Sequence, residues 1–316
     1  MLPEGSARPR RALVTGATGF VGSHLTRTLV HEGWVVHILA RPTADLSALG
    51  PAQDRVTVHR YEGSVQALTA TLDDSAPDVV FHLASLFISE HDPDDVEPLI
   101  AANILFPTLL LEAMSKTRAR CLINTGTAWQ HYQDAPYSPV CLYAATKQAF
   151  EGVLQYYVEA HKFRAITLKL FDTYGPEDRR PKLFSLLARA ARSTQPLAMS
   201  AGDQHLDLVY IDDVVAAYLS AARRLVDELH GGHEVYAVSS GSTVRLRDVV
   251  SVYERVKRMH LNIAWGAMPY RQRETMVPWS GGISLPGWKP RVSLSEGIAR
   301  LGERSGNSLR NGKTLD

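Results

Sequence analysis

The chain has 316 residues, of which 45% are hydrophobic and 21% are charged, the composition of a water-soluble globular protein with a sizeable core. Its 34 basic and 33 acidic residues leave a net charge of +1, which argues against nucleic acid or an acidic membrane surface as the main partner. The two cysteines, Cys121 and Cys141, have neither a disulfide nor a metal-ligand spacing, which favours a reducing compartment.

The first ten residues, Met1–Arg10, are polar and lack the apolar core of a secretion signal. No later apolar run is expected to be long enough to span a bilayer. We therefore expect a soluble, cytoplasmic protein without a membrane partner.

A glycine-rich turn follows the first predicted strand, Arg11–Thr15, and precedes a helical pattern that continues to Glu32. The turn has the pattern G-x-x-G-x-x-G, which is typical of dinucleotide binding when it lies between a strand and a helix. Glycines let the backbone approach a pyrophosphate, which binds the free N–H groups at the start of the helix. We expect cofactor contacts from Gly16, Thr18, Gly19, Phe20, Val21 and Gly22.

The second predicted strand, Val35–Leu39, is followed by Ala40 and Arg41. A site selective for NAD usually has a carboxylate about twenty residues beyond the glycines, where it binds the ribose hydroxyls. Here that acid is missing, and the guanidinium of Arg41 could pair with a 2′-phosphate. This pattern favours NADPH, the alternative being that Arg41 is a surface arginine.

The strand predicted within Asp78–Ser85 is nearly all apolar, as expected for a central parallel strand covered on both faces. It follows a third strand, Val56–Arg60, and a helix that begins near Ser64. We expect its end, Leu83, Ala84 and Ser85, to lie beside the cofactor. His82 is interpreted as a packed or capping residue rather than a catalytic base.

A long helix is predicted over about Asp94–Lys116, and its Asn103 either braces the active-site backbone or is a buried, satisfied amide. The fifth strand, Cys121–Thr125, runs into Gly126–Tyr132. Ligands of doubly wound sheets bind at the carboxyl ends of the strands. Thr127 is therefore placed to hydrogen-bond a substrate oxygen.

Tyr143 and Lys147 lie four positions apart in a predicted helix, Leu142–His161. This spacing places both side chains on one helical face, where the ammonium would lower the pKa of the phenol and make it a proton donor or acceptor. Taken alone, the pattern is also compatible with a solvated surface pair.

Beyond this helix the alternation of strands and helices becomes less regular. Further elements are predicted at Ala165–Leu170, Pro181–Arg192, Asp207–Asp213, Glu234–Val238 and Arg245–Arg258, before an irregular aromatic segment. Lys182, Arg271 and Arg273 are candidates for binding a substrate diphosphate, because such anions need fixed cations, or else are solvated charges. The twelve histidines have no ligand spacing, so we expect no metal site.

The alternation predicts an α/β fold, a doubly wound parallel Rossmann sheet with a smaller C-terminal mixed α/β substrate lobe. We expect a dinucleotide-binding domain over 1–175, with parts of 205–240 returning to it. The substrate lobe is expected mainly over 176–301, and a polar tail over 302–316.

These motifs occur in an order that resembles the extended short-chain dehydrogenase/reductases, the NAD-dependent epimerase/dehydratase family. Besides the glycine turn, Thr127, Tyr143 and Lys147, they include H-L-A-S at His82–Ser85, L-F-D-T-Y-G-P at Leu170–Pro176 and V-Y-I-D-D-V at Val209–Val214. The resemblance covers about Arg11–Leu301. It implies Thr127, Tyr143 and Lys147 as the catalytic set, Phe171 with Tyr143 and Lys147 at the cofactor, and Thr127 and Trp129 at a nucleotide-linked sugar. It also implies a homodimer packed through two helices of each subunit.

Departures from the family pattern narrow the reaction. Dehydratases have an Asp-Glu pair after the strand-end threonine, where this chain has Ala128 and Trp129, so dehydration is not expected. The stretches around Trp129, Tyr143 and Phe171 are most similar to 4-ketoreductases of the CDP-abequose synthase type. Leu206 replaces the arginine and Asp172 the asparagine usual in the family, so the nucleotide and the sugar stay open.

The resemblance implies NADPH-dependent reduction of the C4 ketone of a CDP- or dTDP-linked 4-keto-6-deoxyhexose. Tyr143 would give the ketone oxygen its proton, Thr127 would donate a hydrogen bond, and Lys147 would lower the pKa of Tyr143 and hold the nicotinamide ribose. Two alternatives remain, a nucleotide-sugar epimerase with tightly bound NAD and a non-catalytic dinucleotide-binding redox sensor.

Overall fold

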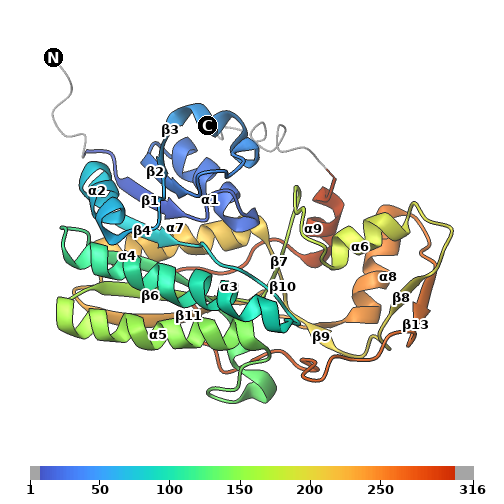
Figure 1. Cartoon of the computed structure of the whole chain (residues 1–316). Coiled ribbons are helices and arrows are strands. Elements are labelled where there is room, and N and C mark those ends of the chain that lie inside the picture. The colour runs from blue at the N-terminus through green and yellow to red at the C-terminus, as the bar shows by residue number, and fades with distance from the viewer. Residues whose placement is uncertain (1–7, 303–316) are drawn as a thin grey trace.

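The computed structural model describes residues 8–302, and within them the main feature is a seven-stranded parallel sheet (Figure 1). The strands lie in the order β11-β6-β5-β4-β1-β2-β3. Their bounds are β1 Arg11–Thr15, β2 Val35–Ala40, β3 Val56–Arg60, β4 Val79–His82, β5 Cys121–Thr127, β6 Arg164–Leu170 and β11 Gly232–Val238. The chain builds outward from β1 to β3 and then returns to place β4 on the other side of β1. The carboxyl ends of β1 and β4 therefore flank the switch point where such sheets bind ligands.

Helices cover both faces of the sheet, which confirms the predicted doubly wound α/β fold. Along β1, Ala12 and Val14 face one layer while Leu13 faces the other, because successive strand residues point to opposite sides. The first layer contains α1 (Phe20–His31) and α7 (Ile211–Asp227). The second contains α2 (Val65–Ser75), α4 (Phe106–Ser115) and α5 (Leu142–His161).

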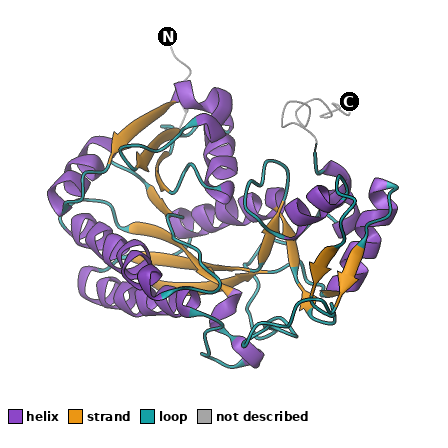
Figure 2. Ribbon diagram, turned by 45° about the vertical axis from the view of Figure 1, so that its right-hand side comes forward, coloured by secondary structure: helices purple, strands orange, loops and turns teal. Residues whose placement is uncertain are grey.

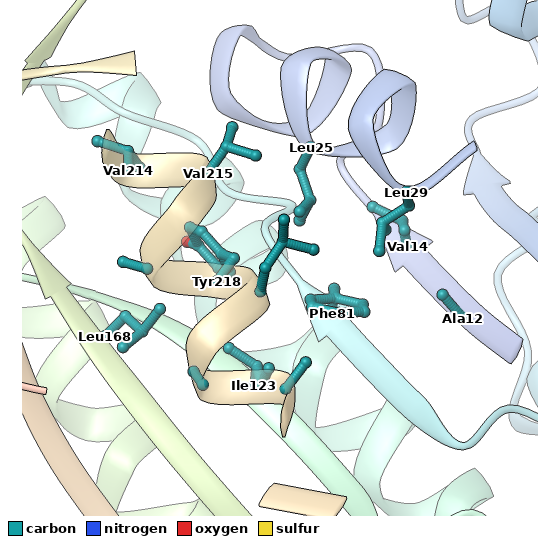
Figure 3. Close-up of a cluster of buried hydrophobic side chains, with 14 of the residues drawn as sticks. Ala12, Val14, Leu25, Leu29, Phe81, Ile123, Leu168, Val214, Val215 and Tyr218 are labelled. Carbon is teal, nitrogen blue, oxygen red and sulfur yellow. The ribbon is translucent and has the colours of Figure 1, made fainter. Parts of the chain in front are cut away.

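Figure 3 shows how α1 and α7 meet over the strands. Leu25 and Leu29 of α1 and Tyr218 of α7 point toward Phe81 and Ile123 of the sheet, and all five side chains are buried. The Tyr218 hydroxyl lies 2.6 Å from the Thr125 hydroxyl, so the polar atom of this core residue is satisfied.

A smaller lobe lies at the right of Figures 1 and 2, beyond the carboxyl end of the sheet. Its helices are α6 (Leu183–Ala190), α8 (Leu246–Lys257) and α9 (Leu294–Arg300), which share a core with Leu187, Tyr253 and Ile298 buried. Paired short strands complete it: β7 (Asp172–Tyr174) with β10 (Leu208–Tyr210), β9 (His205–Leu206) with β12 (Val244–Arg245), and β8 (Leu197–Met199) with β13 (Ile263–Trp265).

The helix predicted over Asp94–Lys116 is not continuous. It consists of a 3₁₀ turn at Pro93–Asp95, α3 (Val96–Ile100), a π turn at Ala101–Leu105 and α4. Another 3₁₀ stretch, Ser47–Arg55, precedes β3 and was not predicted. Single π turns inside helices are frequent at functional sites, and this one contains Asn103.

The prediction that no apolar run could span a bilayer is wrong on length and composition alone. The helical stretch Pro93–Ser115, 23 residues long, is apolar enough to do so. In this structure the stretch packs beside α2 and α5 as one layer of the fold. Core helices of soluble proteins can have the same length and apolar composition as a membrane-spanning helix. The polar tail predicted over 302–316 lies outside the described residues, apart from Gly302.

Candidate active site

The glycine turn packs directly against the end of β4. Gly16 has a φ of 72°, and a Cβ there would lie 2.5 Å from the Ala84 nitrogen. Any Cβ on Gly22 would lie 2.0 Å from the Gly16 oxygen. Gly19 is the N-cap of α1 and provides no side-chain cap, so the first-turn N–H groups of this helix remain available to an anion. This geometry is compatible with a dinucleotide pyrophosphate, and the cofactor contacts of Gly16–Gly22 stay a prediction.

Arg41 is exposed just beyond the carboxyl end of β2, and no carboxylate within residues 8–302 forms an ion pair with it. A second guanidinium, which sequence reasoning missed, lies beside it. Arg60, the last residue of β3, donates hydrogen bonds to the carbonyls of Arg41 (2.8 Å) and Ala44 (3.3 Å). Arg60 thus fixes the turn after β2, and the guanidinium of Arg41 is exposed on that turn. This arrangement is suited to binding a phosphate.

Tyr143 lies in the first turn of α5, and its ring packs edge-on against Phe87 with 4.9 Å between centroids. Its hydroxyl interacts with the side chain of Ser85. Burial raises the pKa of Tyr143 to about 12; Cys141 adds to this rise, while Ser85 and Arg180 oppose it. The phenol is therefore protonated at neutral pH.

This direction corrects the sequence-based expectation that Lys147 lowers the pKa of Tyr143. Lys147 is itself buried, one helical turn further along α5, and burial lowers its pKa to about 8, with Glu151 opposing the shift. For both groups burial is the largest cause of the pKa shift, and neither residue is among the groups that shift the pKa of the other.

Thr127 ends β5 and caps the 3₁₀ turn Ala128–Gln130. Its Oγ1 accepts a hydrogen bond from the Trp129 N–H at 3.2 Å, which leaves the hydroxyl hydrogen free to be donated. The backbone N–H of Thr127 donates to Gln130 Oε1 at 2.9 Å. This capping box fixes the orientation of the threonine at the carboxyl edge of the sheet.

Asn103 is both a satisfied amide and a brace, so the two interpretations left open by the sequence hold together. Its Oδ1 accepts from the Ser85 hydroxyl (2.8 Å) and the Leu86 N–H (2.9 Å), and its Nδ2 donates to the Leu86 carbonyl (2.9 Å) and to Thr146 Oγ1 (3.0 Å). The π turn thereby ties the loop after β4 to the helix that carries Tyr143.

His82 is a packed residue, as predicted. It is fully buried between Phe106 and Phe150, and its Nδ1 lies 2.9 Å from Thr15 Oγ1. Burial lowers the pKa of His82 well below its ordinary value, with Lys147 adding to the shift, so the ring is neutral. No role as a base is assigned to it.

The aromatic side chains of Phe87, Trp129, Phe171 and Trp279 surround the far side of the site. Phe87 packs against Trp129 with 5.5 Å between centroids, and Phe171 stacks on Trp279 at 6.3 Å. A cavity of about 40 Å³ lies between Trp129, Phe171 and Trp279. Phe87 and Trp279 were not predicted, since neither has a motif in its local sequence.

The three predicted diphosphate cations do not lie together. Lys182 is 3.7 Å from an Asp172 oxygen and lies over the Phe87 ring at 4.7 Å. Arg271 pairs with Glu274 at 2.8 Å and lies over Trp129 at 5.1 Å, so both border the aromatic site.

Arg273 lies apart from them, donating to Ser138 Oγ at 2.7 Å and covering the ring of Tyr132. Arg180, missed in the sequence, lies 4.5 Å above the Phe20 ring of the glycine turn and donates to Asp178. It joins the small lobe to the dinucleotide cradle.

One cluster of possible metal ligands lies away from this site, among the residues that the structure describes. Nitrogen atoms of His37 and His59 are 2.9 Å apart, and a carboxylate oxygen of Asp74 is 3.7 Å from His59. The guanidinium of Arg11 is 3.3 Å from the other nitrogen of His37, and this fixed positive charge disfavours a cation there.

Residues 12–239 match the NAD dependent epimerase/dehydratase family. The chain is 26% identical over 295 residues to CDP-abequose synthase of Salmonella muenchen, covering 92% of this chain and 97% of that protein. It is 28% identical over 330 residues to UDP-glucose 4-epimerase of Mycolicibacterium smegmatis, covering 93% and 97%. Among solved structures, UDP-glucuronic acid 4-epimerase from Bacillus cereus, in complex with UDP-glucuronic acid and NAD, superposes with a TM-score of 0.79 at 25% identity, covering 92% and 96%.

Proposed function

The chain belongs to the NAD dependent epimerase/dehydratase family, and we propose that it reduces the C4 ketone of a nucleotide-linked 4-keto-6-deoxyhexose with NADPH. The family match confirms the resemblance inferred from the motifs. The similar proteins indicate an enzyme that modifies nucleotide sugars, and the proposal adds the reaction and the cofactor.

The proposal is carried by the position of Tyr143, whose buried phenol packs against Phe87 and interacts with the side chain of Ser85 just beyond the end of β4. Burial raises the pKa of Tyr143 to about 12, so the phenol can serve as the proton donor of a reduction. A ketone reduction needs an acid at the carbonyl oxygen, whereas an epimerase must first remove a proton from the sugar hydroxyl. Ala128 and Trp129 follow Thr127 and bring no second acid or base.

Bound NADPH would supply the hydride that reaches the C4 carbon. Tyr143 gives its proton to the ketone oxygen as negative charge develops there, and the free hydroxyl hydrogen of Thr127 stabilises the same oxygen. Lys147, one helical turn from Tyr143 on α5, would hold the nicotinamide ribose. Phe87 and Trp129 form an apolar wall suited to the methyl group of a 6-deoxy sugar.

The preference for NADPH is supported by the turn after β2. Arg41 and Arg60 bring two guanidiniums to the position where NAD-selective sites usually have a carboxylate. The B. cereus epimerase was solved in complex with NAD, so cofactor choice is a point on which this chain is proposed to differ from that neighbour.

The direct test is to follow NADPH absorbance at 340 nm with a panel of CDP-, dTDP-, GDP- and UDP-linked 4-keto-6-deoxyhexoses. We expect oxidation with a CDP- or dTDP-linked ketone and a 4-hydroxy product by NMR. Titration with the four free nucleoside diphosphates then ranks the bases independently of turnover. No oxidation with any member of the panel would overturn the proposal.

A second candidate is an epimerase with tightly bound NAD, favoured by the similarity to UDP-sugar 4-epimerases at 25–28% identity. Such an enzyme would copurify with NAD and interconvert UDP-sugars without added cofactor. The absorbance spectrum of the purified protein and an assay lacking NADPH distinguish it from the reductase.

A further inference from the structure

A buried carboxylate lies on the same helix as the proposed catalytic pair. Tyr143, Lys147 and Glu151 are spaced four residues apart on α5, so their side chains follow one face of the helix. Glu151 is buried, and its two oxygens bind different partners. Oε1 accepts from Gln130 Nε2 at 2.8 Å, and Oε2 lies 3.5 Å from Lys169 Nζ, on β6.

The first partner leads to Thr127. The Gln130 amide is completely buried, donating to Glu151 and accepting the Thr127 N–H at 2.9 Å. Gly126 makes this approach possible, because a Cβ there would lie 3.1 Å from both Gln130 Oε1 and Glu151 Oε1. The carboxylate thus acts through one amide on the backbone of the threonine.

The second partner, Lys169, connects Glu151 through His131 to Trp279, which lines the aromatic cavity. Lys169 Nζ is 2.8 Å from His131 Nε2, and His131 Nδ1 is 3.0 Å from the Ala135 carbonyl. The ring of His131 stacks on Trp279 at 3.9 Å with an interplanar angle of 13°. Trp279 lines the same cavity as Trp129.

We propose that Glu151 is a positioning residue for the reductase: through Gln130 it fixes Thr127, and through Lys169 and His131 it fixes the Trp279 wall. The inference rests on the proposed function. Burying an ion pair is a poor source of stability, since desolvation offsets the attraction, so this pair is better explained by the geometry that it imposes. Because Glu151 also lies one turn from Lys147, it favours the charged form of that lysine.

The charges that face these groups come from several elements. Lys147 is influenced by Glu151 from its own helix, and it in turn lowers the pKa of His82 on β4. Glu151 faces Lys169 from β6, and the neutral rings of His131 and His233 lie near Lys169 in turn. Removing the carboxylate removes the influence that raises the pKa of Lys147, so its pKa falls below about 8. The alkaline limb of the kcat profile should therefore move to lower pH.

The test compares Glu151→Gln, which keeps an acceptor for Gln130 and removes the charge, with Glu159→Gln as the matched control. Glu159 is exposed on the same helix, where it accepts a hydrogen bond from Gln155. For Glu151→Gln we expect at least a tenfold loss of kcat, little change in NADPH affinity, and a shifted alkaline limb. The Lys147 ¹³Cε resonance, assigned with Lys147→Arg, should titrate at lower pH. The control should behave as wild type, and a wild-type kcat with an unmoved Lys147 titration in Glu151→Gln would overturn the inference.

A second variant covers the case in which Glu151→Gln does not fold. Glu151→Gln combined with Lys169→Met removes both buried charges, and low kcat with a shifted Lys147 titration supports the inference, whereas wild-type values overturn it. If the wild-type protein reduces no 4-ketohexose, the proposed function fails. The Lys147 titration still decides whether Glu151 governs this site.

Discussion

At the scale of single residues, the environment of Tyr143 decides which chemistry it can perform. The phenol is buried against Phe87 and is not activated by its neighbour Lys147 in the way that their spacing suggested. A ketone reduction requires a protonated donor, and a second hydrogen-bond donor such as the Thr127 hydroxyl stabilises the developing negative charge.

We expect Tyr143→Phe to lower kcat by about a hundredfold or more, because it removes the acid with little change of shape. Affinity for NADPH should stay close to that of wild type, since the ring remains. Steady-state kinetics and fluorescence titration with NADPH measure the two effects. Tyr137→Phe, an exposed tyrosine that precedes this helix, is the control. Near wild-type turnover of Tyr143→Phe would show that another group supplies the proton.

Cofactor choice also depends on one side chain. We expect Arg41→Ala to weaken NADPH binding by about tenfold or more, since a charge-assisted hydrogen bond to phosphate contributes roughly 1.5–3 kcal/mol. Affinity for NADH should change little, because it has no 2′-phosphate. Arg118→Ala controls for the loss of a positive charge. Arg118 is exposed and precedes β5, at the amino-terminal ends of the strands rather than the carboxyl ends. Equal weakening of both cofactors would contradict the assignment.

At the scale of elements, tight packing at the glycine turn reverses the usual stabilising effect of replacing a helical glycine by alanine. Replacing glycine by alanine inside a helix usually stabilises it by about 0.5–1 kcal/mol. In α1, however, a Cβ on Gly22 would lie 2.0 Å from the Gly16 oxygen, so helix and turn would have to move apart.

We expect Gly22→Ala to lower the midpoint of urea unfolding and to abolish dinucleotide binding. Gly152→Ala in α5 is the matched control, because no atom lies within 4 Å of its added Cβ. That variant should be stabilised by about 0.5–1 kcal/mol. A Gly22→Ala protein that is as stable as Gly152→Ala and binds NADPH would show that the turn is not a tight cradle.

The elements that the sequence predicted well are those determined locally. The β1 strand, the glycine turn and α5 follow from periodicity and from glycine geometry over about a dozen residues. The π turn at Ala101–Leu105 could not be predicted, because the contacts of Asn103 are to Ser85, Leu86 and Thr146, which are distant in sequence. The pairing of Glu151 with Lys169 and the stacking of Trp279 on His131 are long-range for the same reason.

At the scale of the whole molecule, the site is built where the two lobes meet. The cavity of about 40 Å³ beside Trp129 is small compared with the roughly 300–1,000 Å³ that ligand pockets occupy. Ser280 binds Asp134 through its N–H and its hydroxyl, both at 2.7 Å, which holds the Trp279 segment over the sheet. The two hydrogen bonds tie the segment of Trp279 to the loop after β5.

The homodimer that the family resemblance implied stays a prediction, and the outer face of the helical layer is where we expect its interface. Exposed apolar residues gather on α3, the π turn and α5, with Ile100 40%, Leu105 53% and Tyr156 60% exposed. These helices lie side by side in Figures 1 and 2. An apolar face of this kind fits the homodimer through two helices per subunit that the family resemblance implied.

We expect the protein to be a dimer by light scattering at micromolar concentration, and Leu105→Glu to shift it to monomer with at least a hundredfold weaker association. In a two-fold interface each substitution is present twice, so two carboxylates would be buried without partners. Ile283→Glu is the control, because Ile283 is 69% exposed but lies outside this layer. A monomeric wild type, or a Leu105→Glu protein that remains dimeric, would place the interface elsewhere or remove it.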